Sequence, residues 1–234
     1  MPSGKKLSWY LATEEYLAKN ITEEIIFFWK VPPTVIFGRH QVMENEVNLT
    51  YCREHNVVLV RRKSGGGCVY ADEGNLMTSY LSPSTHSESV FQHYLDLMAG
   101  ALQRLGLSTV KTEHNDILVI TNPPSSMAGT AHKISGNACY ALPTGTIVHG
   151  TLLYDVDFEA LQQAITPDHD KLAKHGVESV RQRVINIKPL LGSSFQDRDT
   201  EYLKCQLSQL LCQTTGALTP QDIEEIDAIE RENY

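Results

Sequence analysis

Two arginines, a lysine, a serine and three glycines follow one another at positions 61–67 (RRKSGGG), between two runs with strand character. Three glycines in a row weaken any regular element, which indicates a loop that lets a ligand approach. Without Cβ atoms, the backbone N–H groups of Gly65, Gly66 and Gly67 can reach an acyl chain or a phosphate, and Arg61 and Arg62 can pair bidentately with phosphate oxygens. No GK[ST] follows, so this is not a Walker loop. The alternative is a tight β-turn with solvated arginines.

A second small-residue segment, 133–138 (KISGNA), begins with a lone lysine, Lys133, which we place at the edge of a strand. An ammonium there can hold an acyl carbonyl or stabilise the negative charge that builds during acyl transfer. A third segment, 149–153 (HGTLL), carries Gly150 in mid-strand, where glycine indicates close approach of the backbone. Taken alone, Lys133 is more often a solvated surface charge and His149 a structural hydrogen-bonding residue.

The elements that must position these segments are read from apolar periodicity and from Gly and Pro breaks. A helix is expected at 11–19, a short helix at 47–56 and a long helix at 87–107, and the tail from 199 to 233 reads as two helices split at Gly216 and Pro220. A meander is the simplest connection for the close strand runs at 57–62, 68–71 and 75–81. Segment 122–132 is expected to be a mobile loop. The other strand runs are 25–30, 34–39, 116–120, 132–142 and 146–156.

Strands in the middle of the chain, with helices before and behind, predict an α+β fold with a mixed, largely antiparallel β-sheet flanked by helices. With 41% hydrophobic and 21% charged residues, the 234-residue chain suits one globular domain. A net charge of −8 argues against nucleic-acid binding. The five cysteines form no CxxC pair, which argues against a disulfide framework or zinc site and favours the reducing cytoplasm. The absence of an apolar run of ~18 residues argues against membrane insertion.

Taken together, the motifs resemble the catalytic domain of the lipoate-protein ligase A family, from about Leu11 to Tyr234. The resemblance rests on the order of the motifs rather than on any one of them. The motifs are GRHQ (38–41), ENEVN (44–48), RRKSGGGCVYADEGNL (61–76), NDI (115–117), KISGNA (133–138), HGTLL (149–153) and SVRQRVIN (179–186).

The resemblance implies a fold shared with biotin ligases and related to class II tRNA synthetases. It implies that ATP, with Mg²⁺, converts lipoate into lipoyl-AMP, and that a lysine of an apo lipoyl domain then displaces AMP. The expected acceptors are E2 subunits of 2-oxoacid dehydrogenases and the glycine cleavage H protein. By the family pattern, Lys133 is the catalytic residue and Asp116 the candidate Mg²⁺ ligand. The expected substrate and adenylate site consists of Arg62, Ser64, Gly65, Gly66, Gly67, Val69, Asn115, Asp116, Ser135, Gly136, His149, Gly150 and Thr151.

The chain departs from the family pattern in two motifs and at its end. Ala71 stands where the family usually has a histidine, and no arginine occurs between Arg104 and Arg181, where ligases usually carry one soon after KISGNA. The chain also ends about where many ligases begin a small C-terminal domain. We therefore expect a single catalytic domain over 1–234, a small accessory subunit or a ready-made acyl donor, and activation slower than transfer.

Two alternatives remain, the first a related enzyme and the second a protein of another functional class. A lipoyl or octanoyl transferase moves the acyl group through a cysteine thioester, but neither expected nucleophile position holds a thiol: one matches 166–169 (TPDH), and the other falls between Cys68 and Cys139, where no cysteine occurs. Cys68 and Cys139 themselves suit small, half-buried strand positions. A non-catalytic lipoate-binding homologue is the second alternative. A metal hydrolase is a weaker alternative still, because no HxH or HExxH spacing occurs.

Overall fold

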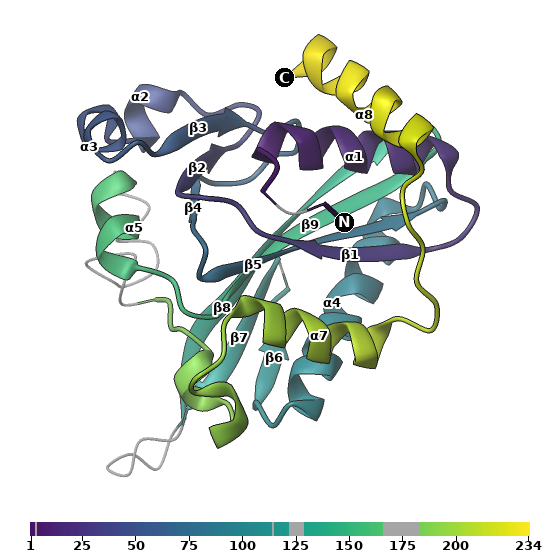
Figure 1. The fold of residues 1–234 in the computed structure, drawn as a ribbon. Coiled ribbons are helices and arrows are strands. Elements are labelled where there is room, and N and C mark those ends of the chain that lie inside the picture. The colour runs from purple at the N-terminus through teal and green to yellow at the C-terminus, as the bar shows by residue number, and fades with distance from the viewer. Residues whose placement is uncertain (3, 114, 122–128, 166–182) are drawn as a thin grey trace.

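The computed structural model describes residues 1–2, 4–113, 115–121, 129–165 and 183–234 as two β-sheets flanked by helices (Figure 1). Most of the segment expected to be mobile, and positions 166–169, lie outside the described residues. The helices are α1 Leu7–Asn20, α2 Met43–Glu46, α3 Leu49–Glu54, α4 Ser87–Arg104, α5 Phe158–Ala164, α7 Thr200–Leu211 and α8 Pro220–Asn233, with short 3-10 turns η2 Lys188–Leu190 and η3 Ser193–Phe195. The strands are β1 Ile25–Trp29, β2 Thr34–Phe37, β3 Val58–Arg61, β4 Val69–Ala71, β5 Asn75–Ser82, β6 Thr109–Lys111, β7 Asp116–Thr121, β8 Thr130–Leu142 and β9 Gly145–Leu153.

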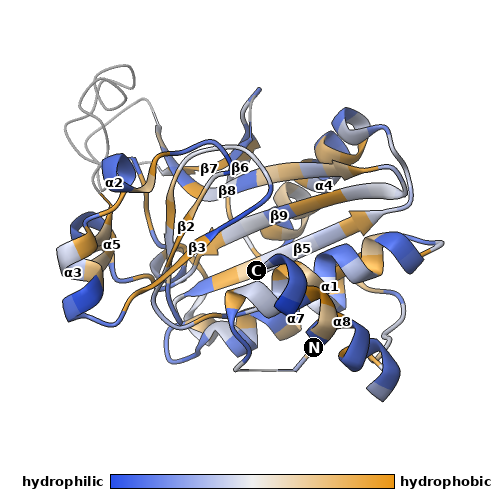
Figure 2. Cartoon of the chain, turned by 90° about the horizontal axis from the view of Figure 1, so that it is seen from above, coloured by the Kyte–Doolittle hydropathy of each residue, from blue (hydrophilic) through white to orange (hydrophobic). Residues whose placement is uncertain are grey.

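The larger sheet is antiparallel throughout, in the order β1-β5-β9-β8-β7-β6. The two faces of this sheet pack into separate hydrophobic cores, because successive side chains of a strand point to opposite sides. Leu76 and Val148 pack under α4 and α7, whereas Met77 and Ile147 pack under α1 and α8. Figure 2 looks down on the second face, where α1 and α8 lie side by side. The predicted α+β architecture is confirmed.

The expected meander of three strands is wrong. In the smaller sheet, ordered β3-β2-β4, β2 lies between β3 and β4, pairing in parallel with β3 and antiparallel with β4. Strand β5 belongs to the larger sheet instead. The physical reason is the seven-residue connection 62–68, which is long enough to pass over β2 and deliver β4 to its far side. The glycine-rich loop is thus a crossover between strands rather than a hairpin turn.

The helix predictions are confirmed, with shifted ends. Helix α1 begins at Leu7 instead of Leu11, and α4 ends at Arg104, shortly before Gly106 adopts a φ of +96°. The tail forms α7 and α8, which begin after Asp199 and Thr219; both side chains accept hydrogen bonds from the first-turn N–H groups of their helices. Among the described residues, no helix is long and apolar enough to cross a membrane.

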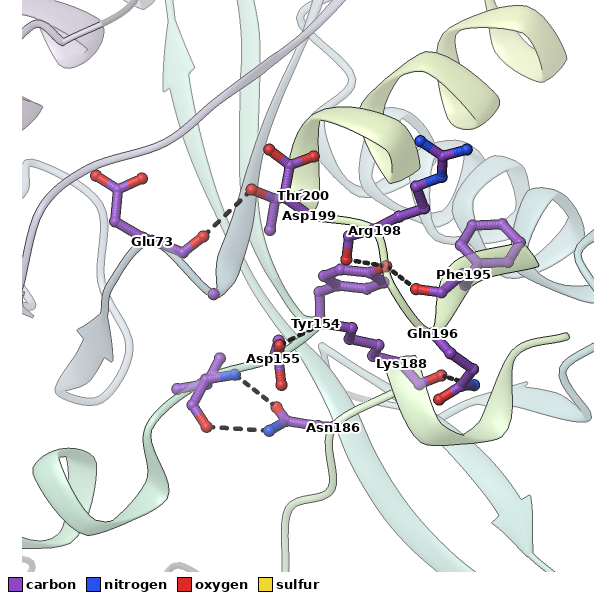
Figure 3. A network of polar contacts seen from close by, with 12 residues as sticks. Glu73, Tyr154, Asp155, Asn186, Lys188, Phe195, Gln196, Arg198, Asp199 and Thr200 are labelled. Carbon is purple, nitrogen blue, oxygen red and sulfur yellow. Dashed lines mark hydrogen bonds and ion pairs between the residues drawn. The ribbon is translucent and has the colours of Figure 1, made fainter. Parts of the chain in front are cut away.

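The segment that follows residue 182 is fastened to the end of β9 by side-chain hydrogen bonds (Figure 3). The Tyr154 hydroxyl lies 3.0 Å from the carbonyl oxygens of both Phe195 and Arg198. The Lys188 ammonium lies 2.7 Å from the Asp155 carboxylate, and the Asn186 amide exchanges two 3.0 Å hydrogen bonds with the backbone of residue 156. These contacts fix the course of the chain just after residues 183–185, which pass beside β8.

Candidate active site

A largely apolar cavity lies where α1, the glycine-rich loop and the two sheets meet. Its apolar wall comes from α1, β1, β2, β4 and β5, and its polar end from β8, β9 and the residue before β7. Ten of the predicted site residues line it: Arg62, Gly66, Gly67, Val69, Asn115, Lys133, Gly136, His149, Gly150 and Thr151. The remaining four, Ser64, Gly65, Asp116 and Ser135, do not line the cavity but hydrogen-bond or ion-pair with residues that do.

The Arg62 side chain holds the glycine-rich loop in shape. Its guanidinium is 5% exposed and donates hydrogen bonds to the carbonyl oxygens of Gly65, Gly67 and Ile36. Gly66 has a φ of +95°, and a Cβ there would lie 2.9 Å from the Arg62 Nη2 atom. Arg61 likewise donates to three backbone carbonyls of residues 38–41. Both guanidinium groups therefore donate their hydrogen bonds to backbone carbonyl oxygens. The pairing of Arg62 with a phosphate stays a prediction.

At the polar end of the cavity, Gly150 on β9 leaves room for a network of hydrogen bonds between two asparagine side chains and a tyrosine. A Cβ on Gly150 would lie 2.1 Å from Asn137 Oδ1 and 2.5 Å from the Tyr94 hydroxyl. The Tyr94 hydroxyl donates to Asn137 Oδ1 at 3.1 Å, and Asn115 and Asn137 each donate a 2.8 Å side-chain hydrogen bond to the other's carbonyl oxygen. These hydrogen bonds fix the side-chain amide of Asn115 at the cavity wall. Asn137 was not among the predicted site residues.

The structure places Lys133 inside a strand and beside a carboxylate, whereas we expected a lone lysine at the edge of a strand. It lies in β8, an inner strand, and its backbone exchanges hydrogen bonds of 2.7 and 3.1 Å with Arg183 and Ile185. Its ammonium lies 2.7 Å from Asp116 Oδ1, at an angle unlike that of a hydrogen bond, and Arg183 Nη2 lies 3.9 Å from Asp116 Oδ2. Two cations thus share one carboxylate and leave the polar end with a net positive charge.

Asp116 alone does not make a metal site. The part of the chain that the structure describes holds no group of three or more His, Cys, Asp or Glu side chains that suits a metal ion. Mg²⁺, however, is commonly held by one or two carboxylates together with substrate phosphates and water. Asp116 Oδ1 is buried and accepts no hydrogen bond, but the Lys133 ammonium lies 2.7 Å from it, so Mg²⁺ would have to replace that ion pair.

His149 links the cavity to a buried carboxylate that the sequence reasoning missed. Its Nε2 atom lies 2.6 Å from the Ser64 hydroxyl, and its Nδ1 atom lies 3.2 Å from Glu14 Oε2. Glu14 is 3% exposed and lies on α1, one turn after Leu11. Leu7, Leu11 and Glu14 share one helix face because they are spaced by four and three residues. That spacing, with a carboxylate on an otherwise apolar stripe, was the signal available in the sequence.

The other missed residues are apolar or small. They include Trp29, Ile36 and Met77, which lie on strands whose buried residues all have the same apolar pattern. That pattern does not distinguish a residue that lines a cavity from one that packs in a filled core. Cys68 and Ala138 complete the wall.

The cysteines near the cavity are poor nucleophiles. All five cysteines are free. Burial raises the pKa of the Cys68 thiol to about 12 and that of the Cys139 thiol to about 11. Because the thiolate is the reactive form, both thiols stay protonated and unreactive at neutral pH. Cys139 lies half-buried in β8, as predicted, whereas Cys68 is half-buried but lies in the glycine-rich loop just before β4.

The chain is thus an α+β domain with an apolar cavity that is closed at one end by a lysine ammonium, paired amides and a glycine-rich loop, as suits a small-molecule site. Residues 7–208 match the family model described as lipoyl protein ligase A/B catalytic domain, and the chain belongs to this family. It is 36% identical to lipoate–protein ligase 1 of Staphylococcus aureus, over 96% of this chain and 66% of that protein. It is 32% identical to lipoate-protein ligase LplJ of Bacillus subtilis, over 96% and 67%. The chain thus spans about two thirds of the length of these relatives.

Solved structures confirm the fold. A lipoate-protein ligase A bound with ATP superposes with a TM-score of 0.74 at 26% identity, over 99% of this chain and 90% of that one. The bi-partite lipoate protein ligase of Thermoplasma acidophilum, described with its E2 lipoyl domain, gives a TM-score of 0.77 at 25% identity, over 99% and 88%.

Proposed function

We propose that this protein is an ATP-dependent lipoate-protein ligase, which converts lipoate into lipoyl-AMP and transfers the lipoyl group to a lysine of a lipoyl domain. The observation that carries the proposal is the cavity itself, apolar along its wall and cationic at one end. An apolar wall suits the acyl chain, whereas a net positive end suits a carboxylate and the phosphate to which it becomes joined.

In this scheme, Leu7, Leu11 and Met77 hold the acyl chain while Lys133 holds its carboxyl group. The Lys133 ammonium, restrained by Asp116, stabilises the oxyanion that forms when a nucleophile attacks the acyl carbon. The amide of Asn115, locked by Asn137, supplies a further donor at the same end. ATP provides the activation, because AMP is a far better leaving group than hydroxide.

The magnesium role of Asp116 belongs to this proposal. With nucleotide phosphates in place, the Asp116 carboxylate, now paired with Lys133, would be the protein ligand of Mg²⁺, which would help to neutralise the phosphate charge. The glycine-rich loop would lie against the adenylate, its N–H groups directed at the phosphate.

The proposed acceptors are apo lipoyl domains, namely those of E2 subunits and the glycine cleavage H protein. Support comes from the Thermoplasma relative, which is described with an E2 lipoyl domain. That relative is also described as bi-partite, which supports a separate accessory subunit for this chain. The cytoplasm, where free cysteines persist, is the proposed location.

A transferase that takes a preformed acyl donor is the second candidate. A thioester route is disfavoured, because burial keeps Cys68 and Cys139 protonated. A route from preformed lipoyl-AMP would use the same cavity and the same lysine. It differs from the ligase only in that another enzyme converts lipoate into lipoyl-AMP.

One assay separates the candidates. Purified protein receives ATP, Mg²⁺, lipoate and an apo lipoyl domain, and AMP release and acceptor mass are followed separately, with octanoate in a parallel reaction. A ligase yields both AMP and a lipoylated acceptor. Acceptor modified only when lipoyl-AMP is supplied identifies the transferase, and tight lipoate binding with neither product identifies a non-catalytic homologue.

A further inference from the structure

The glycine-rich loop, residues 62–68, is tied to two helices by three side chains. Lys63 Nζ in the loop lies 2.6 Å from Glu15 Oε1 on α1. The hydroxyl of Tyr234, the residue that follows α8, donates to the same oxygen at 2.5 Å. The Lys63 ammonium also lies 4.8 Å from the centre of the Tyr234 ring, within the range of a cation–π contact. Glu15, Lys63 and Tyr234 are called the anchoring cluster below.

The buried carboxylate of Glu15 makes this cluster depend on Lys63. The Glu15 side chain is 8% exposed and the Lys63 side chain 32%. A carboxylate removed from water is unfavourable unless a cation or hydrogen-bond donors accompany it. Among the charged groups that the structure describes, Lys63 is the cation within ion-pair distance of Glu15. Moving the loop away from α1 would leave this carboxylate without its cation, so the ion pair favours the position in which the loop lies against α1.

The anchoring cluster joins two parts of the cavity wall. Leu11 of α1 lines the cavity, and Glu15 follows it by four residues, on the same face of the helix. Gly66 and Gly67 line the cavity from the loop. The Lys63–Glu15 ion pair therefore connects α1 to the loop, and both segments would contact the acyl chain of the proposed substrate.

The other polar contacts of the loop run to different segments. Arg62 donates within the loop and to Ile36 of β2. The Ser64 carbonyl accepts from the Arg39 N–H at 3.0 Å, and the Ser64 hydroxyl lies 2.6 Å from His149 Nε2. Within the described part of the chain, the anchoring cluster is thus the polar connection between the loop and α1.

We propose that Glu15, Lys63 and Tyr234 are positioning residues that hold the glycine-rich loop against α1 and so retain a bound acyl chain, an inference that rests on the proposed ligase function. None of the three lines the cavity, so they act through the loop rather than by touching the substrate. Release of the acyl chain past the loop requires that the Lys63–Glu15 ion pair break. Loss of the ion pair should therefore speed release of lipoate, whereas transfer from bound lipoyl-AMP should proceed at nearly its normal rate.

The first measurement is the release of labelled lipoate during a chase with excess unlabelled lipoate. Lys63→Met removes the charge and keeps an unbranched side chain. We expect release about tenfold faster, an effect between that of an exposed and that of a buried ion pair. Lys63→Arg restores the cation and should return release to within about threefold of normal, and Tyr234→Phe should give a smaller increase than Lys63→Met. Single-turnover transfer at saturating lipoyl-AMP should stay within a few-fold of normal in every variant.

The second measurement is hydrogen exchange of amides 63–67 in the protein without ligand, which does not depend on the proposed function. Exchange should be about tenfold faster in Lys63→Met, because the loop leaves α1 more often. Lys111→Met is the matched control. The Lys111 ammonium also lies 2.6 Å from a carboxylate, that of Asp96, and its side chain is 34% exposed, but it lies on β6, which does not line the cavity. This variant should change neither release nor loop exchange.

Unchanged loop exchange in folded Lys63→Met would overturn the proposal, and so would release that is unchanged or that Lys63→Arg does not restore. Slower transfer from saturating lipoyl-AMP with normal release would also overturn it, because the lysine would then serve the reaction itself. Failure of the unmodified protein to bind lipoate, with loop exchange still faster in Lys63→Met, would instead count against the proposed function.

Discussion

At the scale of single residues, the ammonium of Lys133 is the group on which the proposed chemistry depends most. It lies between the cavity and Asp116, is partly exposed, and has its backbone clamped by residues 183–185. A side chain whose backbone is held so firmly loses little mobility on binding a ligand.

Replacement of Lys133 by alanine should abolish transfer while leaving the fold intact. Loss of the oxyanion partner should cost about 100-fold or more in rate. The lost ion pair is partly solvated, so the free energy of unfolding should change by only about 1 kcal/mol. Lipoylation rate and thermal melting measured on the same preparation check both halves. Near-normal transfer by the variant would remove Lys133 from the site.

Gly66→Val should block acyl binding and lower stability together. Valine at a φ of +95° is strained, and its Cβ meets Arg62 Nη2, which fixes the loop. A cost of about 2 kcal/mol would lower the melting temperature by roughly 4–8 °C. Gly65→Ala is the matched control, because no atom lies within 4 Å of a Cβ there and its φ is not positive. Tight lipoate binding by a folded Gly66→Val protein would contradict this assignment.

The cysteines should be dispensable for transfer. Replacing all five by serine or alanine should leave transfer from lipoyl-AMP within a few-fold of normal, since Cys68 and Cys139 are protonated until pH approaches 11–12. Alkylation of these two thiols by iodoacetamide, followed by peptide mass spectrometry, should be slow at pH 7 and accelerate only at high pH. An acylated Cys68 or Cys139 that turns over at the catalytic rate would favour the thioester transferase instead.

At the scale of elements, α8 fastens α1, the helix that supplies Leu7, Leu11 and Glu14 to the site. Side chains of Ser8, Trp9 and Tyr16 donate hydrogen bonds to carboxylates along α8, and Glu15 accepts from Tyr234. Ile226 of α8 is fully buried in the same interface. Lys63 of the glycine-rich loop also binds Glu15, at 2.6 Å. The position of α8 is therefore coupled to two parts of the cavity wall, α1 and the glycine-rich loop.

The hydrogen bond from Tyr16 to Asp222 should make the stability of the α1–α8 interface decrease at high pH. The hydrogen bond to Asp222 raises the pKa of Tyr16 to about 12, above its ordinary value of 10.0. A raised pKa means that the contribution is fully present below pH 10 and is lost as pH rises from about 10 to about 12. Tyr16→Phe should therefore lose less stability than the unmodified protein over that interval. Thermal melting from pH 9 to pH 12 measures the difference, and parallel curves would contradict it.

At the scale of the whole molecule, the cavity joins parts that would otherwise be independent. Its wall includes α1, the smaller sheet and the larger sheet, so the acyl chain of the proposed substrate would contact all three. A ligand bound to such a junction stabilises the entire fold, because unfolding any one part releases it.

Lipoate should therefore raise the melting temperature of the protein as a whole. At about 100 times its dissociation constant, a ligand adds about 2.7 kcal/mol, which corresponds to roughly 5–10 °C for a chain of this size. Calorimetric scans with and without lipoate measure the shift, and a short acid such as acetate, too small to fill the cavity, is the control. An upward shift of only part of a split transition would show that the cavity does not unite the fold.

The sequence by itself determined the features that depend on neighbouring residues. Three successive glycines predicted a loop, the 3.6-residue periodicity of 87–107 predicted α4, and Asp199 and Thr219 open the two tail helices. Motif order was sufficient to indicate the family. The tertiary structure alone decided which distant segments meet: β2 inserted between β3 and β4, Arg183 beside Asp116, and Glu14 beside His149 across 135 positions. Such pairings depend on strand register and on the packing of the whole chain, and a local pattern carries no information about either.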